Sequence, residues 1–297
     1  MHKGQVLIVD DLPDVRVTIS GLLTDAGYEV RSASNMTEAL DAFGKETFQI
    51  AVLDVRLDET NEDNKDGLLL MHEINRRSPA TAIIILTGYA DVKMVRDALQ
   101  PGIDGIPSAF GFLEKNEINR IVDSVDQAFA HVIRTGKLSI ETIIGQGEND
   151  HVEFKSSIRW DYGTNSANKT LQEVLATTIA GMLNSKGGTL LIGVADNGTI
   201  LGIENDLQTL AKKDRDGFQL ALTDIVKTYL GVTYIQHVHA RFESVRGKQI
   251  CVLSVDKSPS PVFLTRGEET KFWVRMNNST RCLDVRDAMN YIEANWQ

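Results

Sequence analysis

The sequence predicts two domains, an α/β domain built on a parallel sheet and then an α+β domain with a mixed or antiparallel sheet. The first prediction rests on short apolar runs that alternate with amphipathic segments through roughly the first 130 residues, as in buried parallel strands joined by helices. The second rests on a hairpin signal in the other half, where Arg246-Gly247-Lys248 separates two strand-like runs. A length of 297 residues also favours two domains.

Apolar runs and helical periodicity place the elements of the first domain. Strands are predicted at 6–9, 48–53, 82–86 and 110–113, and helices at 15–25, 37–44, 67–77, 91–100 and 117–134. The last helix is longer than one side of a small sheet requires. It is either a long final helix half packed on the sheet, or a surface that joins a homodimer or carries motion to the next domain.

The second half has strand-like and helical segments in a different order. Strands are predicted at 151–156, 188–195, 242–245, 249–255 and 272–276, and helices at 170–184, 218–230 and 284–295. Thr135-Gly136-Lys137 interrupts the helical pattern, as glycine near a helix end often does. We therefore expect a first domain over 1–134, a linker over 135–147 and a second domain over 148–297.

The negative charge of the chain belongs to the first domain. Residues 1–130 carry 12 basic and 22 acidic side chains, a net charge of −10, whereas residues 131–297 carry 19 of each. A neutral second domain neither requires nor excludes a nucleic-acid partner, although a strongly basic one would have favoured it.

Nothing in the sequence predicts export or membrane insertion. No apolar stretch approaches membrane-spanning length, and the residues after Met1 lead into a predicted strand rather than a signal peptide. Cys251 and Cys282 have neither metal-ligand nor disulfide-scaffold spacing, which suits a reducing compartment. We expect a cytoplasmic protein without a membrane partner.

Polar side chains stand where the predicted strands of the first domain end. Asp10 and Asp11 follow the first strand, Asp54 follows the second, and Thr87 and Lys115 stand at or just beyond later ones. Parallel strands bring such ends together at one edge of the sheet, where ligands bind. Clustered carboxylates suit Mg²⁺, and a carboxylate can accept a phosphoryl group covalently. The sequence therefore predicts a Mg²⁺-dependent phosphorylation site.

These residues resemble, one by one, the receiver domain of bacterial two-component response regulators. The resemblance spans roughly residues 5–132 and implies a flavodoxin-like fold with a doubly wound, five-stranded parallel sheet. The roles it implies are phosphoacceptor for Asp54, Mg²⁺ binding for Asp10, Asp11, Asp54 and the backbone carbonyl of Arg56, phosphoryl contact for Thr87 and Lys115, and switch aromatic for Phe112. It also implies a sensor histidine kinase as partner.

Two segments of the first half depart from the receiver pattern. The loop after Asp54 carries an acidic insertion over residues 59–66, and the stretch from Pro101 to Ala109 is longer than expected. The second stretch lies where receivers transmit their signal, so the family's rules for dimerisation need not transfer.

Four clusters in the second half carry polar or glycine-rich patterns. They are 145–155, which includes Glu148, Glu153 and Lys155, then Asn184-Ser185-Lys186-Gly187-Gly188, then 193–198, which includes Asp196, and last 273–281, which includes Arg275 and Arg281. Each alone is typical of a helix end, a turn or a strand face. The glycine-rich helix end lacks the Gly-Lys-Ser/Thr ending of a phosphate-binding loop, which argues against nucleotide hydrolysis.

Together, in this order, the clusters resemble the Schlafen-type AlbA_2 domain over about residues 139–296. Some animal Schlafen relatives cleave structured RNA with a divalent metal and a carboxylate trio, which would fall on Glu148, Glu153 and Asp196 with Lys155 beside them. Bacterial members are regarded as DNA-binding. The corresponding phosphate contacts would be Lys155, Arg159, Lys186, Arg275 and Arg281, with Trp160 or Trp273 stacking on a base.

We therefore expect a response regulator whose receiver controls the second domain. Three outputs remain open: DNA binding with transcriptional control, metal-dependent cleavage of RNA, and protein docking without nucleic acid. The phosphoryl transfer to Asp54 is the one catalytic step that all three share.

Overall fold

The structure is a computed structural model that describes residues 3–58, 60–61, 63–88 and 109–296. The chain divides into two compact units, Met1–Ser139 and Ile140–Gln297. Some predicted features lie outside the described residues. They are the helix at 91–100, residues 101–108 of the long stretch that ends at Ala109, and Glu59 and Glu62 of the acidic insertion.

The first unit is built on a parallel sheet of five strands within the described residues. The strands are β1 (Gln5–Val9), β2 (Glu29–Ala33), β3 (Ile50–Asp54), β4 (Ala82–Thr87) and β5 (Gly111–Glu114). Their order is β2-β1-β3-β4-β5. The central strands β3 and β4 are buried along their whole length, as expected when helices cover both faces of a parallel sheet. This confirms the predicted doubly wound α/β fold.

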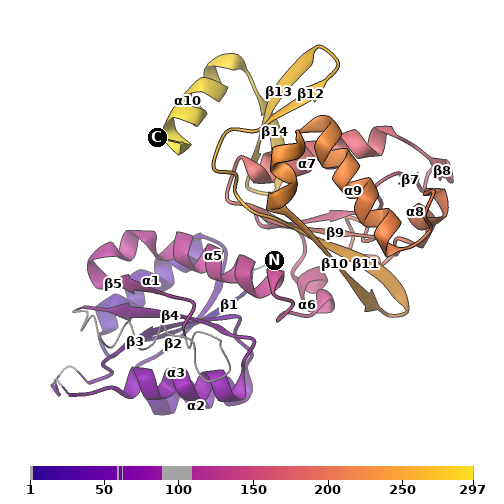
Figure 1. Ribbon diagram of the computed structural model, residues 1–297. Helices are drawn as coiled ribbons and strands as arrows, with labels where there is room; N and C mark the ends of the chain where they lie inside the picture. The colour runs from indigo at the N-terminus through magenta and orange to yellow at the C-terminus, as the bar shows by residue number, and fades with distance from the viewer. Residues whose placement is uncertain (1–2, 59, 62, 89–108, 297) are drawn as a thin grey trace. The chain divides into compact units, whose positions relative to one another are not determined.

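Helices cover the two faces of this sheet (Figure 1). They are α1 (Pro13–Asp25), α2 (Met36–Lys45), α3 (Asp66–Arg77), the 3-10 helix η1 (Lys115–Arg120) and α5 (Ile121–Arg134). Helices α1 and α5 pack together on one face, and α2 and α3 on the other. Helix α2 begins with a reciprocal cap, because Asn35 accepts from the Glu38 N–H (3.0 Å) while Glu38 accepts from the Ser34 N–H (2.8 Å).

The second unit is built on a mixed sheet with two smaller sheets beside it. Its described strands are β6 (Val152–Lys155), β7 (Trp160–Asp161), β8 (Ser166–Ala167), β9 (Gly188–Ile192), β10 (Val238–Val245), β11 (Lys248–Val255), β12 (Phe263–Arg266), β13 (Glu269–Met276) and β14 (Ser279–Leu283). The main sheet has the order β10-β11-β9-β6, in which β6 and β9 are parallel and the other pairs are antiparallel. This confirms the α+β prediction.

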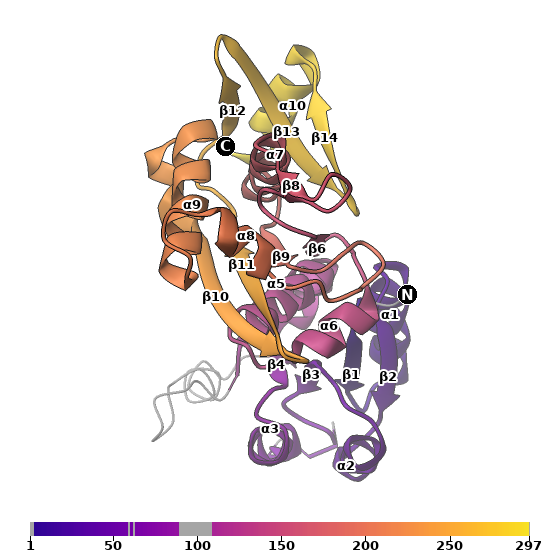
Figure 2. The ribbon, with the colours of Figure 1, turned by 90° about the vertical axis from the view of Figure 1, so that its right-hand side faces the viewer.

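The described helices of the second unit pack on its sheets. They are α6 (Ile140–Gln146), α7 (Thr170–Leu183), α8 (Glu204–Thr209), α9 (Arg215–Tyr229), the 3-10 helix η2 (Val232–His237) and α10 (Val285–Asn295). Helices α7 and α9 share one apolar cluster with β9 and β11. Strands β12–β14 form a separate antiparallel sheet, and α10 packs on β14 at its edge (Figure 2).

Two details bear on the predicted organisation. The hairpin signal at Arg246-Gly247 joins β10 to β11, with both residues at positive φ. Residues 140–146, within the segment predicted as a linker, form helix α6 of the second unit. Across the described ranges, no helix is both long and apolar enough to cross a membrane.

Candidate functional site

The polar residues predicted at the strand ends of the first unit meet at one edge of its sheet. Asp54 is the last residue of β3, and Asp10 directly follows β1, the strand beside it. Thr87 ends β4, on the other side of β3, and Lys115 directly follows β5. All four strands are parallel, so their carboxyl ends lie together.

Lys115 joins the two buried carboxylates of this edge. Its ammonium lies 2.7 Å from Asp54 Oδ2 and 2.8 Å from Asp10 Oδ2. Burial raises the pKa of Asp54 to about 6, although the Lys115 hydrogen bond opposes that rise. Burial alone would lower the pKa of Lys115, but its hydrogen bonds to both carboxylates outweigh this effect and raise it. The lysine therefore stays charged and holds Asp54 in place.

The same edge offers a set of oxygen ligands. Carboxylate oxygens of Asp10, Asp11 and Asp54 all lie within 4.8 Å of one another. Three hard oxygen donors, partly open to solvent at Asp11, match the ligand preference of Mg²⁺. Arg56 follows two residues after Asp54 and is half-buried. The residues present thus fit the predicted cation.

Two predicted switch residues differ in exposure. Thr87 is buried at the end of β4, whereas the Phe112 side chain on β5 is 44% exposed. The neighbouring aromatic residue, Phe110, contacts the His131 ring of α5 at 5.1 Å between centroids. Phe112 is thus a large, partly exposed apolar side chain on the strand that leads to Lys115.

In the second unit, β6 carries the predicted pair of charged residues on one face. Val152 and Phe154 are buried while Glu153 and Lys155 are half-buried, in the expected alternation. The Lys155 ammonium donates to one oxygen of Glu153. The other oxygen of Glu153 accepts from Arg275 on β13 at 2.8 Å. Both oxygens of Glu153 therefore have cationic partners.

Arg275 is a buried structural link rather than a surface cation. Its side chain is 1% exposed. Beyond Glu153, the guanidinium donates to the carbonyls of Asp150 (2.9 Å), Asn149 (2.6 Å) and Val152 (3.2 Å). The prediction that Arg275 contacts nucleic acid is wrong, because a guanidinium buried among these acceptors does not reach a phosphate. It ties the start of β6 to β13 instead.

The predicted carboxylate trio is close but not assembled. Burial raises the pKa of Glu148, and the nearby charges of Glu153 and Asp196 raise it further, against a hydrogen bond from the Phe154 N–H (2.8 Å). Asp196 is exposed in the turn after β9. Among the residues that the structure describes, the groups of acids and histidines within 4.8 Å of one another do not include these three. The Glu148 carboxylate is thus held by the backbone N–H of Phe154.

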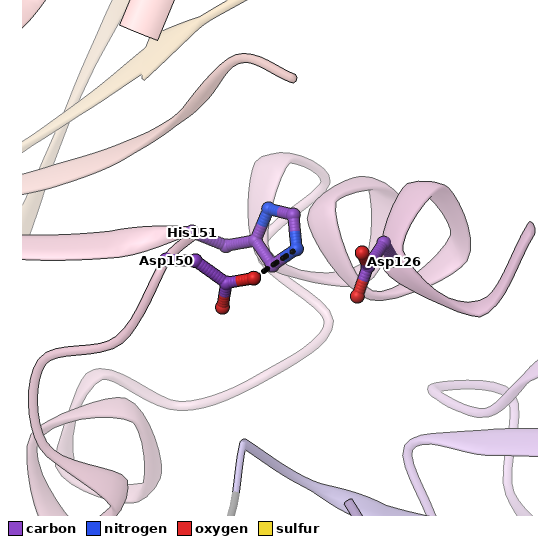
Figure 3. A group of neighbouring side chains, drawn as sticks. All are labelled: Asp126, Asp150 and His151. Atoms are coloured by element: carbon purple, nitrogen blue, oxygen red, sulfur yellow. Dashed lines mark ion pairs between the residues drawn. The ribbon is translucent and has the colours of Figure 1, made fainter. Parts of the chain in front are cut away.

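The loop that enters β6 contains an ion pair between neighbours. Asp150 Oδ2 lies 3.6 Å from His151 Nε2 (Figure 3). Asn149 fixes the loop, because its side-chain oxygen accepts from the N–H groups of His151 (2.8 Å) and Val152 (3.0 Å). Asp126, also drawn in Figure 3, belongs to the first unit, where it accepts a hydrogen bond from Tyr28 (2.7 Å).

The first unit matches a known family. The model of the response regulator receiver domain covers residues 6–126. This range contains the β1, β3 and β4 strand ends and Lys115 in the geometry given above. The first unit is a response regulator receiver domain. The family model named Schlafen, AlbA_2 covers residues 148–284, so the receiver domain is followed by an AlbA_2 domain.

Curated relatives resemble part of the chain. The DNA-binding transcriptional regulator NtrC of Klebsiella pneumoniae is 32% identical over 132 residues, 44% of this chain and 26% of that protein. The response regulator protein PilR of Pseudomonas aeruginosa is 33% identical over 115 residues, 39% of this chain and 23% of that protein. The chain thus spans about a quarter of these relatives. The receiver domain of NtrX from Brucella abortus is 28% identical, with a TM-score of 0.36, over 42% of this chain and 97% of that one.

Sequence reasoning missed Gly67 in the receiver domain. Its N–H donates to the carbonyl of Val55 (3.1 Å), which holds the start of α3 against the end of β3. A Cβ atom here would stand 1.7 Å from the backbone oxygen of Asp54. The signal was the glycine at the start of a helical pattern, where a better helix former is expected. Gly67 therefore lets α3 begin directly against the backbone of Asp54.

The Asn184-Ser185 motif of the AlbA_2 domain has a structural role. The buried Asn184 side chain donates to the carbonyls of Val262 (2.7 Å) and Trp273 (2.8 Å) and accepts from the Val262 N–H (2.8 Å). Ser185 exchanges hydrogen bonds with the backbone of Arg275, each 3.0 Å long. The end of α7 is thus clamped to the sheet of β12–β14. The sequence pattern marks the motif but does not indicate that it bonds to β13.

The remaining predicted nucleic-acid contacts lie at or near the surface of the AlbA_2 domain. Lys186 after α7 and Arg281 on β14 are exposed, and Arg159 is half-buried in the loop after β6. Trp160 and Trp273 are half-buried. Contact of these residues with nucleic acid stays a prediction.

Proposed function

We propose that this chain is a two-component response regulator in which phosphorylation of Asp54 by a sensor histidine kinase controls nucleic-acid binding by the AlbA_2 domain. The observation that carries the proposal is the placement of Lys115 against both Asp54 and Asp10, at 2.7 and 2.8 Å. A salt bridge with only a structural role would need one acid to pair with Lys115. Two buried acids, a third beside them and a shared lysine suit an incoming phosphoryl group.

The receiver residues divide the phosphoryl transfer between them. A carboxylate oxygen of Asp54 forms a bond to phosphorus as the bond from phosphorus to the kinase histidine nitrogen breaks, and the histidine leaves as a neutral imidazole after taking up a proton. Mg²⁺ held by Asp10, Asp11, Asp54 and the Arg56 carbonyl would neutralise charge on the phosphoryl oxygens. Lys115 then moves its contact from Asp54 to a phosphoryl oxygen, and the Thr87 hydroxyl donates to another.

The proposed relay runs from Thr87 to Phe112. A phosphoryl group that draws the Thr87 hydroxyl toward it leaves space behind that side chain. Phe112 is 44% exposed before this change, so it has apolar area to bury. Its inward rotation would alter the surface around β5, which gives the receiver two states that phosphorylation biases.

Asp54 is expected to be the acid of this region that accepts the phosphoryl group. Acetyl phosphate with Mg²⁺ should add one phosphate to the wild-type chain and none to Asp54→Asn, as read by intact-mass spectrometry. Asp58→Asn changes an exposed acid four residues away and should label like the wild type. Equal labelling of Asp54→Asn and the wild type would remove the basis of the proposal.

Nucleic-acid binding is supported by the AlbA_2 domain's own residues. The chain spans only 26% of NtrC, so the DNA binding in that relative's name does not carry over by itself. Lys186 and Arg281 are exposed, after α7 and on β14. Exposed cations suit phosphate contacts.

Cleavage of RNA is the weaker candidate. In its favour, the pKa of Glu148 is raised by burial and also by the negative charges of Glu153 and Asp196, as expected for neighbouring carboxylates. Against it, both oxygens of Glu153 are bound by cationic side chains, which would have to release them before a metal could bind. Binding without cleavage is therefore the proposed output.

A further inference from the structure

The AlbA_2 domain contains a cavity that neither phosphorylation nor the exposed basic residues explain. It has a volume of about 450 Å³ and opens between α7 and α9, which lie side by side (Figure 1). Its walls come from the loop after β6, from α7, from the segment that joins α8 to α9, and from α9. Cavities of this size commonly hold small organic ligands.

Arg159 lines this cavity with an unused hydrogen-bonding group. Its Nε atom is shielded from solvent and has no hydrogen-bond partner among the described residues. No carboxylate of the described residues forms an ion pair with the Arg159 guanidinium. Arg275 is the contrast in the same domain, since it donates to four acceptors. A shielded cationic donor without an acceptor is unfavourable until a ligand supplies one.

Asp206 holds the Arg159 backbone in position. This buried carboxylate on α8 accepts from the N–H groups of Ile158 (3.1 Å), Arg159 (2.9 Å) and Trp160 (2.9 Å). Three hydrogen bonds to consecutive backbone groups fix the turn independently of the Arg159 side chain. The guanidinium is thus presented to the cavity by a rigid support, as binding sites require.

The rest of the lining is mainly apolar. Leu210, Ile225 and Leu220 contribute apolar area, and Leu220 is 61% exposed at the cavity. Lys212 also lines the cavity but is paired with Asp216 (2.6 Å) and Asp214 (3.6 Å). The anchor for an anionic group is thus Arg159, with Asp224 as a carboxylate of the lining. The lining therefore suits a molecule with an apolar body and one anionic group.

We propose that this cavity binds a small amphipathic organic anion, a carboxylate or a phosphate monoester on an apolar body, with Arg159 as the anchor of the anionic group. A planar guanidinium pairs with either head group through parallel N–H donors. The site is separate from the phosphoacceptor. It also assigns Arg159 a different ligand from the nucleic-acid phosphate that its sequence position predicts.

Calorimetric titration of the full-length protein tests this proposal. The probes are octanoate and octyl phosphate, with octylamine as a cationic probe of equal chain length. Both anions should bind with dissociation constants below about 1 mM, and octylamine should not. The tighter of the two anions identifies the head group, carboxylate or phosphate.

Three variants locate the binding. Arg159→Gln should weaken anion binding about tenfold or more, because one charge-assisted contact is lost. Leu220→Glu, which places a negative charge at an exposed position of the lining, should weaken it as well. Arg286→Gln removes an exposed arginine of α10 that does not line the cavity and should bind like the wild type. Unchanged tryptophan fluorescence would show that each variant is folded.

Several results would overturn the proposal. Octylamine that binds as well as octanoate would show an apolar hollow without anion selectivity. An Arg159→Gln protein that is folded and binds with wild-type affinity would place the anion elsewhere. Absence of binding by both anions at about 10 mM would leave the cavity without this ligand class.

Discussion

Arg275→Met is expected to lower the free energy of unfolding of the AlbA_2 domain by about 3–5 kcal/mol, because it removes one partner of a buried ion pair together with the donor of three carbonyl groups. Glu153 would keep only Lys155, and the carbonyls of Asp150 and Asn149 would lose their donor. Methionine fills similar volume, so the loss reports on the hydrogen bonds and the charge more than on packing.

Urea unfolding followed by tryptophan fluorescence isolates this effect. The three tryptophans, Trp160, Trp273 and Trp296, all lie in the second unit, so their signal does not report on the receiver domain. Arg286→Met, at an exposed arginine of α10, is the matched control and should shift the transition by less than about 0.5 kcal/mol. If Arg275→Met shifts the unfolding transition as little as the control does, Arg275 does not hold β6 to β13.

Glu153→Gln should cost less stability when it is added to Arg275→Met than when it is made in the wild-type protein, because the Glu153–Arg275 contact is already lost in that variant. The amide keeps the shape of the side chain. The double-mutant cycle therefore measures the Glu153–Arg275 interaction apart from the carbonyl contacts of Arg275. If the two substitutions are additive, Glu153 and Arg275 do not interact in solution.

Gly67→Ala is expected to reduce phosphorylation of Asp54 roughly a hundredfold, because displacement of a reacting group by about 1 Å has effects of that size. The added Cβ would stand 1.7 Å from the Asp54 carbonyl oxygen and 2.9 Å from that of Val55. Both contacts are with backbone and cannot be relieved by a side-chain rotation. The start of α3 must move, and the end of β3 with it.

Gly44→Ala is the matched control for this substitution. Gly44 lies within α2, where a Cβ would have nothing within 4 Å. The control should be phosphorylated at the wild-type rate and be slightly more stable, by up to about 1 kcal/mol, as for glycine to alanine in a helix. Rates come from intact-mass spectrometry after mixing with acetyl phosphate and Mg²⁺. Equal rates for the two variants would show that the contact at Gly67 does not position Asp54.

The sequence was most informative where burial is complete. Strands β3 and β4 are buried at every position, so their apolar runs stand out from the rest of the chain. Strand β2 lies at the sheet edge and carries Glu29, Arg31 and Ser32, so no apolar run marks it. The strands β12 and β14 were missed for the same reason, since most of their residues are exposed or half-buried.

Site prediction succeeded where topology alone brings residues together. Asp10, Asp54 and Lys115 follow parallel strands, so their proximity follows from strand order. Arg275 is the opposite case, because its partners come from a loop more than 120 residues earlier in the chain, as the separation of 125 positions from Asp150 shows. The sequence shows that Arg275 is positively charged, but it does not show whether the guanidinium is buried against other residues or exposed for a ligand.

The most direct test of the central claim compares nucleic-acid affinity with and without a phosphate on Asp54. Fluorescence anisotropy would follow a labelled random-sequence duplex titrated with untreated and with acetyl phosphate-treated protein, at several salt concentrations. We expect affinities that differ at least about fivefold between the two forms, a steep salt dependence, intact nucleic acid and no difference for Asp54→Asn. Equal affinities for the phosphorylated and unphosphorylated wild-type protein would contradict control of the AlbA_2 domain by the receiver, and binding that is indifferent to salt would contradict nucleic acid as its ligand.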